Sequence, residues 1–145
     1  MANQNVRVAV NGYGVIGKRV ADAVKLQPDM ELVGIGDVVS DYRVKAAAIH
    51  GLPIYASLAE KGDEMQAAGI PVAGTLDDLL AQVDVIVDCT PKGIGAKNLA
   101  RYRAAGVKAI YQGGEKHSLT GHSFVAQANY RSALGRDATR VVSCN

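Results

Sequence analysis

The chain has 145 residues, the size of one ordinary domain, and its content of 48% hydrophobic and 21% charged residues is typical of a globular protein. A net charge of +2 is too small to indicate nucleic-acid or anionic-membrane binding. Apolar runs stay below the roughly 20 residues that span a bilayer, and the N-terminus lacks the apolar core of a signal peptide, so we expect a cytoplasmic chain.

The stretch from Val6 to Val24 reads VRVAVNGYGVIGKRVADAV and predicts a strand, a tight turn and a helix. Gly12, Gly14 and Gly17 form the pattern G-x-G-x-x-G at the turn. In such a junction the first glycine permits the sharp turn, the second lets a pyrophosphate approach the backbone, and the third lets the helix pack closely on the strand. The positive end of the helix then faces the phosphates. The stretch therefore predicts dinucleotide binding.

A nucleotide-hydrolase phosphate loop is excluded by one position. Gly12 to Lys18 also fits G-x-x-x-x-G-K, but the next residue is Arg19. That loop needs Ser or Thr there to hold magnesium. No metal site is predicted.

The second predicted strand, Glu31 to Ile35, leads into Gly36 and Asp37. An acidic residue about twenty positions after the third glycine is typical of dinucleotide folds, where it accepts hydrogen bonds from the adenosine ribose. Asp37 thus predicts NAD rather than NADP, because its charge repels a 2′-phosphate. Arg43 and Lys45 follow closely and leave NADP binding open.

Three helices are predicted in the next part of the chain. The first is 41–49; the second begins at a capping-box pattern of Ser57 and Glu60 and ends near Gly69; the third, 76–81, is capped by Thr75. The sequence predicts no chemistry here, and its charges fit a solvated face.

A buried strand from Val83 to Cys89 is followed by Thr90 and Pro91, at a strand end of the kind where open parallel sheets bind ligands. Thr90 fits cofactor contact and simple helix capping equally well, and a helix over 94–105 is expected next. Cys89 has apolar neighbours, which is typical of a core thiol. With Cys144 it makes too few cysteines for a disulfide framework, so both are expected to be free.

The strand from Val107 to Tyr111 runs into the paired glycines Gly113 and Gly114, which fit a ligand-binding loop or a plain turn. The pattern of 123–134 fits either helix or strand, and 140–143 is a last β-rich run. Strands and helices alternate, which predicts a single α/β domain over 1–145 with a doubly wound parallel sheet.

Several stretches together resemble the cofactor domain of archaeal-type (type 2) glyceraldehyde-3-phosphate dehydrogenase. They are NGYGVIGKRVADAV at 11–24, VDVIVDCTPKGIG at 83–95, VKAIYQGGEK at 107–116, SFVAQANYRSALG at 123–135 and Ser143-Cys144-Asn145 at the end. The resemblance covers essentially the whole chain. It implies an NAD- or NADP-dependent enzyme, usually a homotetramer, that converts glyceraldehyde 3-phosphate and phosphate to 1,3-bisphosphoglycerate.

The resemblance also implies site residues. Cys144 corresponds to the nucleophile, and Ser143 and Asn145 correspond to substrate-contacting positions. It places cofactor contacts on Gly14, Val15 and Gly114. With the residues predicted from the pattern, the expected cofactor-binding set is Gly12, Gly14, Val15, Ile16, Gly17, Asp37, Thr90, Pro91 and Gly114.

The chain departs from the family at two places. Gly36-Asp37-Val38 stands where many members have a Thr-Lys-Thr run that favours NADP. The family's second half, with its catalytic histidine, is absent from this chain, and His50, His117 and His122 do not match that histidine. We therefore expect a chain that binds NAD but needs a C-terminal half for activity.

The sequence is also compatible with other functions of the same fold. They are the cofactor domains of aspartate-semialdehyde or homoserine dehydrogenases, and a non-enzymatic dinucleotide-sensing or CoA-binding module. Among the dehydrogenases, homoserine dehydrogenase needs no cysteine nucleophile, so the surroundings of Cys144 separate the members of that group.

Overall fold

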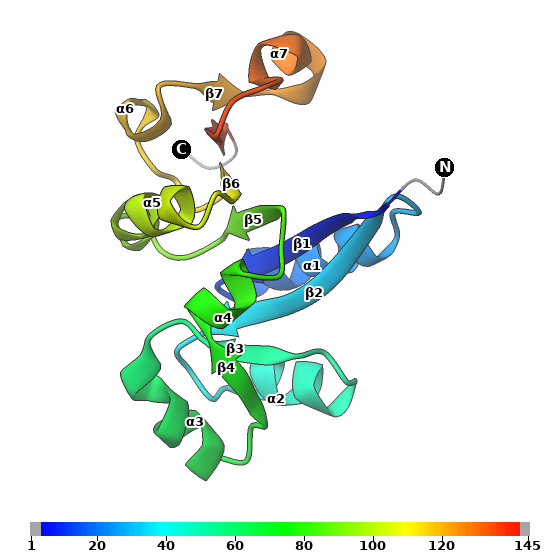
Figure 1. Cartoon of the computed structure of the whole chain (residues 1–145), viewed down its shortest axis with the longest axis vertical. Helices are drawn as coiled ribbons and strands as arrows, with labels where there is room; N and C mark the ends of the chain where they lie inside the picture. The colour runs from blue at the N-terminus through cyan, green and yellow to red at the C-terminus, as the bar shows by residue number, and fades with distance from the viewer. Residues whose placement is uncertain (1–3, 143–145) are drawn as a thin grey trace.

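A computed structural model describes residues 4–142 of the chain, which form one eight-stranded, fully parallel sheet with helices on both faces (Figure 1). The strands are β1 (Val6–Asn11), β2 (Met30–Asp37), β3 (Ile54–Ala56), β4 (Val72–Thr75), β5 (Val85–Asp88), β6 (Lys108–Tyr111), β7 (Ser123–Phe124) and β8 (Ala138–Val141). The helices are α1 (Val15–Lys25), α2 (Tyr42–Ile49), the 3-10 helix η1 (Ala59–Lys61), α3 (Gly62–Ala67), α4 (Leu76–Leu80), α5 (Ile94–Ala104), α6 (His117–Thr120) and α7 (Ala126–Ala133).

The strand order is β4-β3-β2-β1-β5-β6-β8-β7, so the strands β2, β3 and β4 lie on one side of β1 and the later strands lie on its other side. Asn11, the last residue of β1, pairs with Gly36 of β2 on one side and with Asp88 of β5 on the other. These strand ends therefore lie level across the sheet. Ligands of open α/β sheets bind outside such a switch point, so the topology places the candidate site above Asn11.

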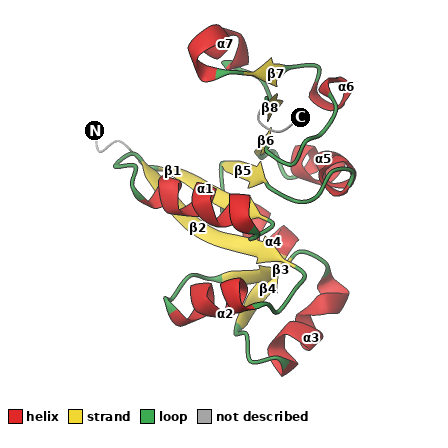
Figure 2. Cartoon of the chain, turned by 180° about the vertical axis from the view of Figure 1, so that it is seen from behind, coloured by secondary structure: helices red, strands yellow, loops and turns green. Residues whose placement is uncertain are grey.

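Each face of the sheet has its own hydrophobic core. One core contains Val8 and Val10 of β1 and is covered by α1, α2 and α3; the other contains Ala9 and Ile86 and is covered by α4 and α5. Figure 1 shows α4 in front of the sheet, and Figure 2, seen from behind, shows α1 and α2 covering the opposite face. The predicted doubly wound α/β fold is confirmed.

Two helix starts follow the sequence prediction closely. The Asp41 carboxylate accepts hydrogen bonds from the backbone N–H groups of Arg43 and Val44 and caps α2. Thr75 forms a capping box with Asp78 at the start of α4. Each side chain satisfies N–H groups that the first helical turn leaves without a partner.

The predicted capping box at Ser57 is wrong. The Ser57 hydroxyl donates to the Oδ1 atom of Asn11 at 2.5 Å, so it does not cap a helix. Leu58 stands at the N-cap of η1, with Glu60 inside that short helix, and α3 follows directly. A buried polar partner 46 residues away outcompeted the local pattern.

The ambiguous stretch 123–134 contains both kinds of structure, since β7 is followed directly by α7. The last predicted strand is displaced toward the N-terminus, because β8 spans Ala138–Val141. In the described part of the chain the longest helices have 11 residues, and none combines the length and apolar character of a transmembrane helix.

His122 joins β8 to α7 through two hydrogen bonds and is only 6% exposed. Its Nδ1 atom lies 2.6 Å from the Thr139 hydroxyl, and its Nε2 atom lies 2.8 Å from the Ser132 hydroxyl. Because Ser132 donates its own hydrogen to the Asn129 carbonyl, it must accept one from His122 Nε2. Burial, with the nearby charge of Arg136 second, lowers the pKa of His122 below its usual 6.5.

This pKa shift predicts a pH-dependent stability. The unfolded chain takes up a proton on His122 more readily than the folded chain, so the stabilisation is complete above pH 6.5 and declines as pH falls through that value. Urea unfolding at pH 7.5 and 5.5 should show a smaller pH effect in His122→Gln than in the unmodified chain. His50→Gln, at an exposed position, is the control and should keep the full effect. Equal pH effects in all three proteins would contradict this role.

Candidate functional site

The glycine turn lies at the switch point and packs directly against the end of β5. Gly12 has φ of +88°, which disfavours residues with a side chain. A Cβ atom at Gly12 would lie 2.9 Å from the Cys89 carbonyl carbon and 2.9 Å from the Thr90 nitrogen. Gly12 therefore permits both the turn and the close contact between two strand ends.

Gly17 and Gly14 serve different purposes. A Cβ atom on Gly17 would lie 1.8 Å from the Gly12 carbonyl oxygen, so this glycine is needed for helix packing. At Gly14 a Cβ atom would meet nothing within 4 Å, so that position is open. Val15 and Ile16, at the first turn of α1, are exposed.

The N-terminus of α1 carries no charge that would oppose an anion. Gly14 stands at the N-cap without a side-chain hydrogen bond, and the first turn contains no acidic residue. The first backbone N–H groups of a helix have no partner within the helix, and they carry its positive dipole end. This terminus, next to an open glycine, therefore fits a phosphate or pyrophosphate group.

Asp37 holds the glycine turn in place. Its Oδ2 atom accepts a hydrogen bond from the Tyr13 backbone N–H at 2.7 Å, and its Oδ1 atom accepts from Val38 at 2.7 Å and Val39 at 3.3 Å. A carboxylate has about four acceptor positions, so one on Oδ2 stays available. Asp37 thus retains the capacity that ribose binding needs, while it also fixes the turn.

A crevice of about 350 Å³ lies outside the ends of β1, β2 and β5. Four predicted residues line it together: Gly12, Asp37, Thr90 and Pro91. The other lining residues were missed by the sequence analysis: Asn11, Val38, Ser57, Leu58, Ile94, Lys97 and Asn98. The polar ones on 94–98 lie on α5, where helical periodicity alone does not separate a ligand-facing side from a solvated side.

A buried polar network forms the floor of this crevice. Asp88 is fully buried, and its carboxylate accepts hydrogen bonds from the Thr90 hydroxyl at 2.5 Å and the Tyr102 hydroxyl at 2.6 Å. The Tyr102 oxygen in turn accepts one from the Asn11 side-chain amide at 2.8 Å. Burial, with the Asp88 charge second, raises the pKa of Tyr102, so this hydroxyl keeps its proton.

The loop with the paired glycines has structural reasons for its sequence. A Cβ atom on Gly113 would lie 2.0 Å from the Thr90 carbonyl oxygen, and Gly114 has φ of +76°. Glu115 then accepts hydrogen bonds from the Gly93 and Ala96 backbone N–H groups at the start of α5. Gly114 does not line the crevice, and its contact with a cofactor stays a prediction.

The two cysteines differ in what the structure says of them. Cys89 packs against the core under α1, and burial raises its pKa to about 12, with the neighbouring Asp88 charge as the second cause. It stays a protonated thiol at neutral pH, as expected of a core cysteine. Ser143, Cys144 and Asn145 lie outside the described residues.

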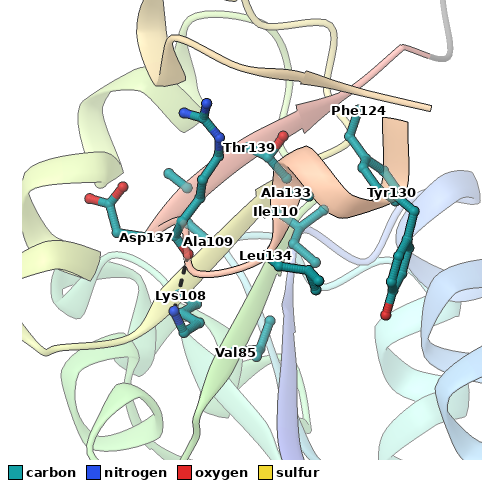
Figure 3. A pocket seen from close by; sticks show the side chains of 12 residues that line it. Val85, Lys108, Ala109, Ile110, Phe124, Tyr130, Ala133, Leu134, Asp137 and Thr139 are labelled. Carbon is teal, nitrogen blue, oxygen red and sulfur yellow. Dashed lines mark hydrogen bonds between the residues drawn. The ribbon is translucent and has the colours of Figure 1, made fainter. Parts of the chain in front are cut away.

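A second cavity, of about 230 Å³, lies between α7 and the strands β5, β6 and β8 (Figure 3). Its wall is mainly apolar, with Phe124, Tyr130 and Leu134 among the lining side chains. Of its charged residues, Lys108 bonds the Arg136 carbonyl and Asp137 pairs with Arg103. The glycine turn is not part of this cavity, so it does not fit the predicted dinucleotide site.

Residues 6–113 match the family model described as dihydrodipicolinate reductase, N-terminus. The chain is also 58% identical over 140 residues to the glyceraldehyde-3-phosphate dehydrogenase of Thermococcus kodakarensis, and 53% identical over 140 residues to that of Methanothermobacter thermautotrophicus. Each match covers 97% of this chain but only 42% of the relative. The chain thus spans about two fifths of the length of these curated relatives.

Solved structures share the fold at low identity. GenD2 from gentamicin A biosynthesis, solved in complex with NAD, aligns with a TM-score of 0.57 and 22% identity over 75% of this chain and 27% of its own. The WlbA dehydrogenase from Bordetella pertussis, in complex with NADH and UDP-GlcNAcA, gives 0.57 and 22% over 77% of this chain and 28% of its own. At this identity the likeness shows the fold alone.

The different surroundings of the two glycines predict different effects of the same substitution. Gly17→Ala should lower the free energy of unfolding by about 2 kcal/mol or more, because its Cβ atom collides with backbone. Gly14→Ala should change it by less than about 0.5 kcal/mol, because the new methyl group points into open space. Urea denaturation of both variants measures this, and equal destabilisation would contradict the described turn.

Proposed function

The chain belongs to the family of the dihydrodipicolinate reductase N-terminus, and we propose that it is the NAD-binding part of a phosphorylating glyceraldehyde-3-phosphate dehydrogenase. The proposal rests on the similarity of the chain to archaeal glyceraldehyde-3-phosphate dehydrogenases. The family match ends at residue 113, whereas the similarity to the dehydrogenases covers 97% of the chain. The identity beyond residue 113 favours this enzyme over other members of the fold.

The observation that carries cofactor binding is the open Gly14 beside the N-terminus of α1, at the switch point of the sheet. The pyrophosphate of NAD would meet the first N–H groups of α1, and Asp37 would accept hydrogen bonds from the adenosine ribose. Thr90 and Pro91, across the crevice, would flank the remainder of the cofactor. In this proposal Val15, Ile16, Gly17 and Gly114 complete the cofactor site.

The proposed reaction uses Cys144 as the nucleophile. Its thiolate attacks the aldehyde carbon of glyceraldehyde 3-phosphate, and phosphate later cleaves the resulting thioester to give 1,3-bisphosphoglycerate. The nicotinamide, when bound, supplies the hydride acceptor. Ser143 and Asn145 flank Cys144 and would contact the substrate. A thiol with a pKa near 8.5 is mostly protonated at neutral pH, so Cys144 needs a neighbouring base or helix N-terminus.

We place the base and most of the substrate-phosphate site in the part of the relatives that this chain does not match. That part would be the C-terminal catalytic half, joined to an NAD-binding domain over 1–145. The intact enzyme would be a cytoplasmic homotetramer.

The carboxylate of Asp37 should set the cofactor preference. The unmodified chain should bind NAD more tightly than NADP, because the Asp37 charge repels a 2′-phosphate. Asp37→Asn keeps one carbonyl oxygen for the backbone N–H groups but removes the charge, so the ratio of the two dissociation constants should shrink. Calorimetry measures both constants. Asp84→Asn removes an equal charge from an exposed carboxylate that pairs with Arg7 outside the crevice, and it should leave the ratio unchanged. Tighter NADP binding by the unmodified chain would refute this assignment.

The 145-residue chain alone should turn over very slowly. General acid–base assistance typically contributes about 10²–10⁴-fold, so the chain alone should produce NADH from glyceraldehyde 3-phosphate and phosphate at less than about 1% of the rate seen when a C-terminal half is supplied. Gly14→Ala should reduce NAD binding and the restored rate together, since its methyl group enters the space assigned to the pyrophosphate. Cys144→Ser should abolish the restored rate and leave NAD binding intact. Robust turnover by the 145-residue chain alone would show that the base is misplaced.

A further inference from the structure

The fully buried Asp88 is held by neutral donors. Its four hydrogen bonds come from the Thr90 backbone and hydroxyl, the Tyr102 hydroxyl and, at 3.4 Å, the Asn98 amide. Among residues 4–142 no cation forms an ion pair with it. A carboxylate only accepts hydrogen bonds, so each of these neighbours must point a hydrogen toward Asp88.

Donation to Asp88 also fixes which groups donate and which accept in the next hydrogen bonds across the floor of the crevice. Tyr102 gives its single hydrogen to Asp88, so its oxygen can only accept from Asn11, and the amide nitrogen of Asn11 must face Tyr102. The Asn11 carbonyl oxygen then faces Ser57, which must donate. Asp88 thereby fixes the orientation of a hydroxyl group at the end of β3.

The absence of a side chain at Gly36 provides the space for these hydrogen bonds. A Cβ atom on Gly36 would lie 2.7 Å from the Ser57 oxygen and 2.9 Å from the Asn11 Oδ1 atom. Arg101 also holds the Ser57 backbone, through a hydrogen bond of 3.3 Å to its carbonyl oxygen. Gly36 and Arg101 therefore keep Ser57 where Asn11 can reach it.

The consequence is a crevice wall that accepts hydrogen bonds. Ser57 and Thr90 both line the crevice, and each donates its only hydroxyl hydrogen to the network. Toward a ligand, both hydroxyl groups can therefore only accept hydrogen bonds. Asp37 adds a carboxylate. The charged lining residues are Asp37 and Lys97, one of each sign. Hydrogen-bond direction therefore acts on ligand choice in addition to the local charge of Asp37.

We propose that Asp88 is a positioning residue that, through Tyr102 and Asn11, makes the crevice wall an acceptor of hydrogen bonds. The wall then selects the hydroxyl groups of an unmodified nucleoside sugar over a phosphorylated sugar. A ribose hydroxyl donates to such a wall, whereas a phosphate ester at the same position presents acceptor oxygens and leaves Ser57, whose backbone N–H bonds the Asp37 carbonyl, without a donor. The inference rests on the proposed NAD-binding function, and it identifies a determinant of specificity beneath the surface of the crevice.

The test separates hydrogen-bond direction from charge. Tyr102→Phe keeps the Asp88 carboxylate but cuts its link to Asn11, so Ser57 is free to turn its hydrogen toward the ligand. Calorimetry on the 145-residue chain should show that the ratio of the NADP to the NAD dissociation constant falls by about tenfold, the range expected for one misdirected buried hydrogen bond. Asp88→Asn should lower the ratio at least as far. Asp84→Asn is the control, because Asp84 is exposed, pairs with Arg7 and lies outside the crevice; its ratio should be unchanged.

A double-mutant cycle tests the path itself. In a Ser57→Ala background the network has no hydroxyl to orient at its far end, so Tyr102→Phe should add less than about twofold to the change in ratio. Ser57→Ala alone should already weaken NAD binding more than NADP binding. Its side chain is only half-buried, so this variant decides the question if Tyr102→Phe does not fold.

The outcomes are distinct. Normal NAD binding with an unchanged ratio in Tyr102→Phe and Ser57→Ala would overturn the role of Asp88 and leave the proposed function intact. Absence of NAD binding by the unmodified, folded chain would refute the proposed function and this inference with it.

Discussion

The contact between the glycine turn and the end of β5 is the constraint on which the other features depend. Gly12 leaves no room for a Cβ atom beside the backbone of Cys89 and Thr90, and Gly17 leaves none between α1 and the same turn. Because backbone rather than side chain fills these contacts, the first turn of α1 and the end of β5 are held at one edge of the sheet. The crevice opens at this edge because α1, which follows β1, and α5, which follows β5, cover opposite faces of the sheet.

Stability and ligand recognition share the same groups at this edge. Burying a carboxylate costs several kcal/mol unless hydrogen bonds compensate, and Asp88 receives four of them from elements that converge on the switch point. Asp37, at the end of β2, likewise accepts a hydrogen bond, from the Tyr13 backbone N–H in the glycine turn. The residues that would read a ligand are therefore already oriented before it arrives, which lowers the entropic cost of binding.

Local patterns predicted much of the fold and less of the site. The alternating and 3.6-residue periods located β1, α1 and α5, and the cap at Thr75 could be predicted because its partner Asp78 is three residues away. The cap at Asp41 was not predicted, since that residue was expected to be the first of the helix. Ser57 was misread, since its hydroxyl bonds Asn11 across 46 positions and no local signal reveals such a partner. Lys97 and Asn98 were missed for a different reason. Helical periodicity shows which side of α5 is polar, but the fold decides which polar residues face the crevice.

The strand order also has a consequence for synthesis from the N-terminus. As the chain emerges, β2 adds to β1, β3 to β2 and β4 to β3, so the first half of the sheet grows by one edge at a time. β5 then pairs with the free edge of β1, and β6 with β5. Up to that point the neighbour of each new strand has already been synthesised, although the second edge of β1 stays unpaired until β5 is made. β7 is the exception in the described part of the chain, because it must wait for β8 before it joins the sheet.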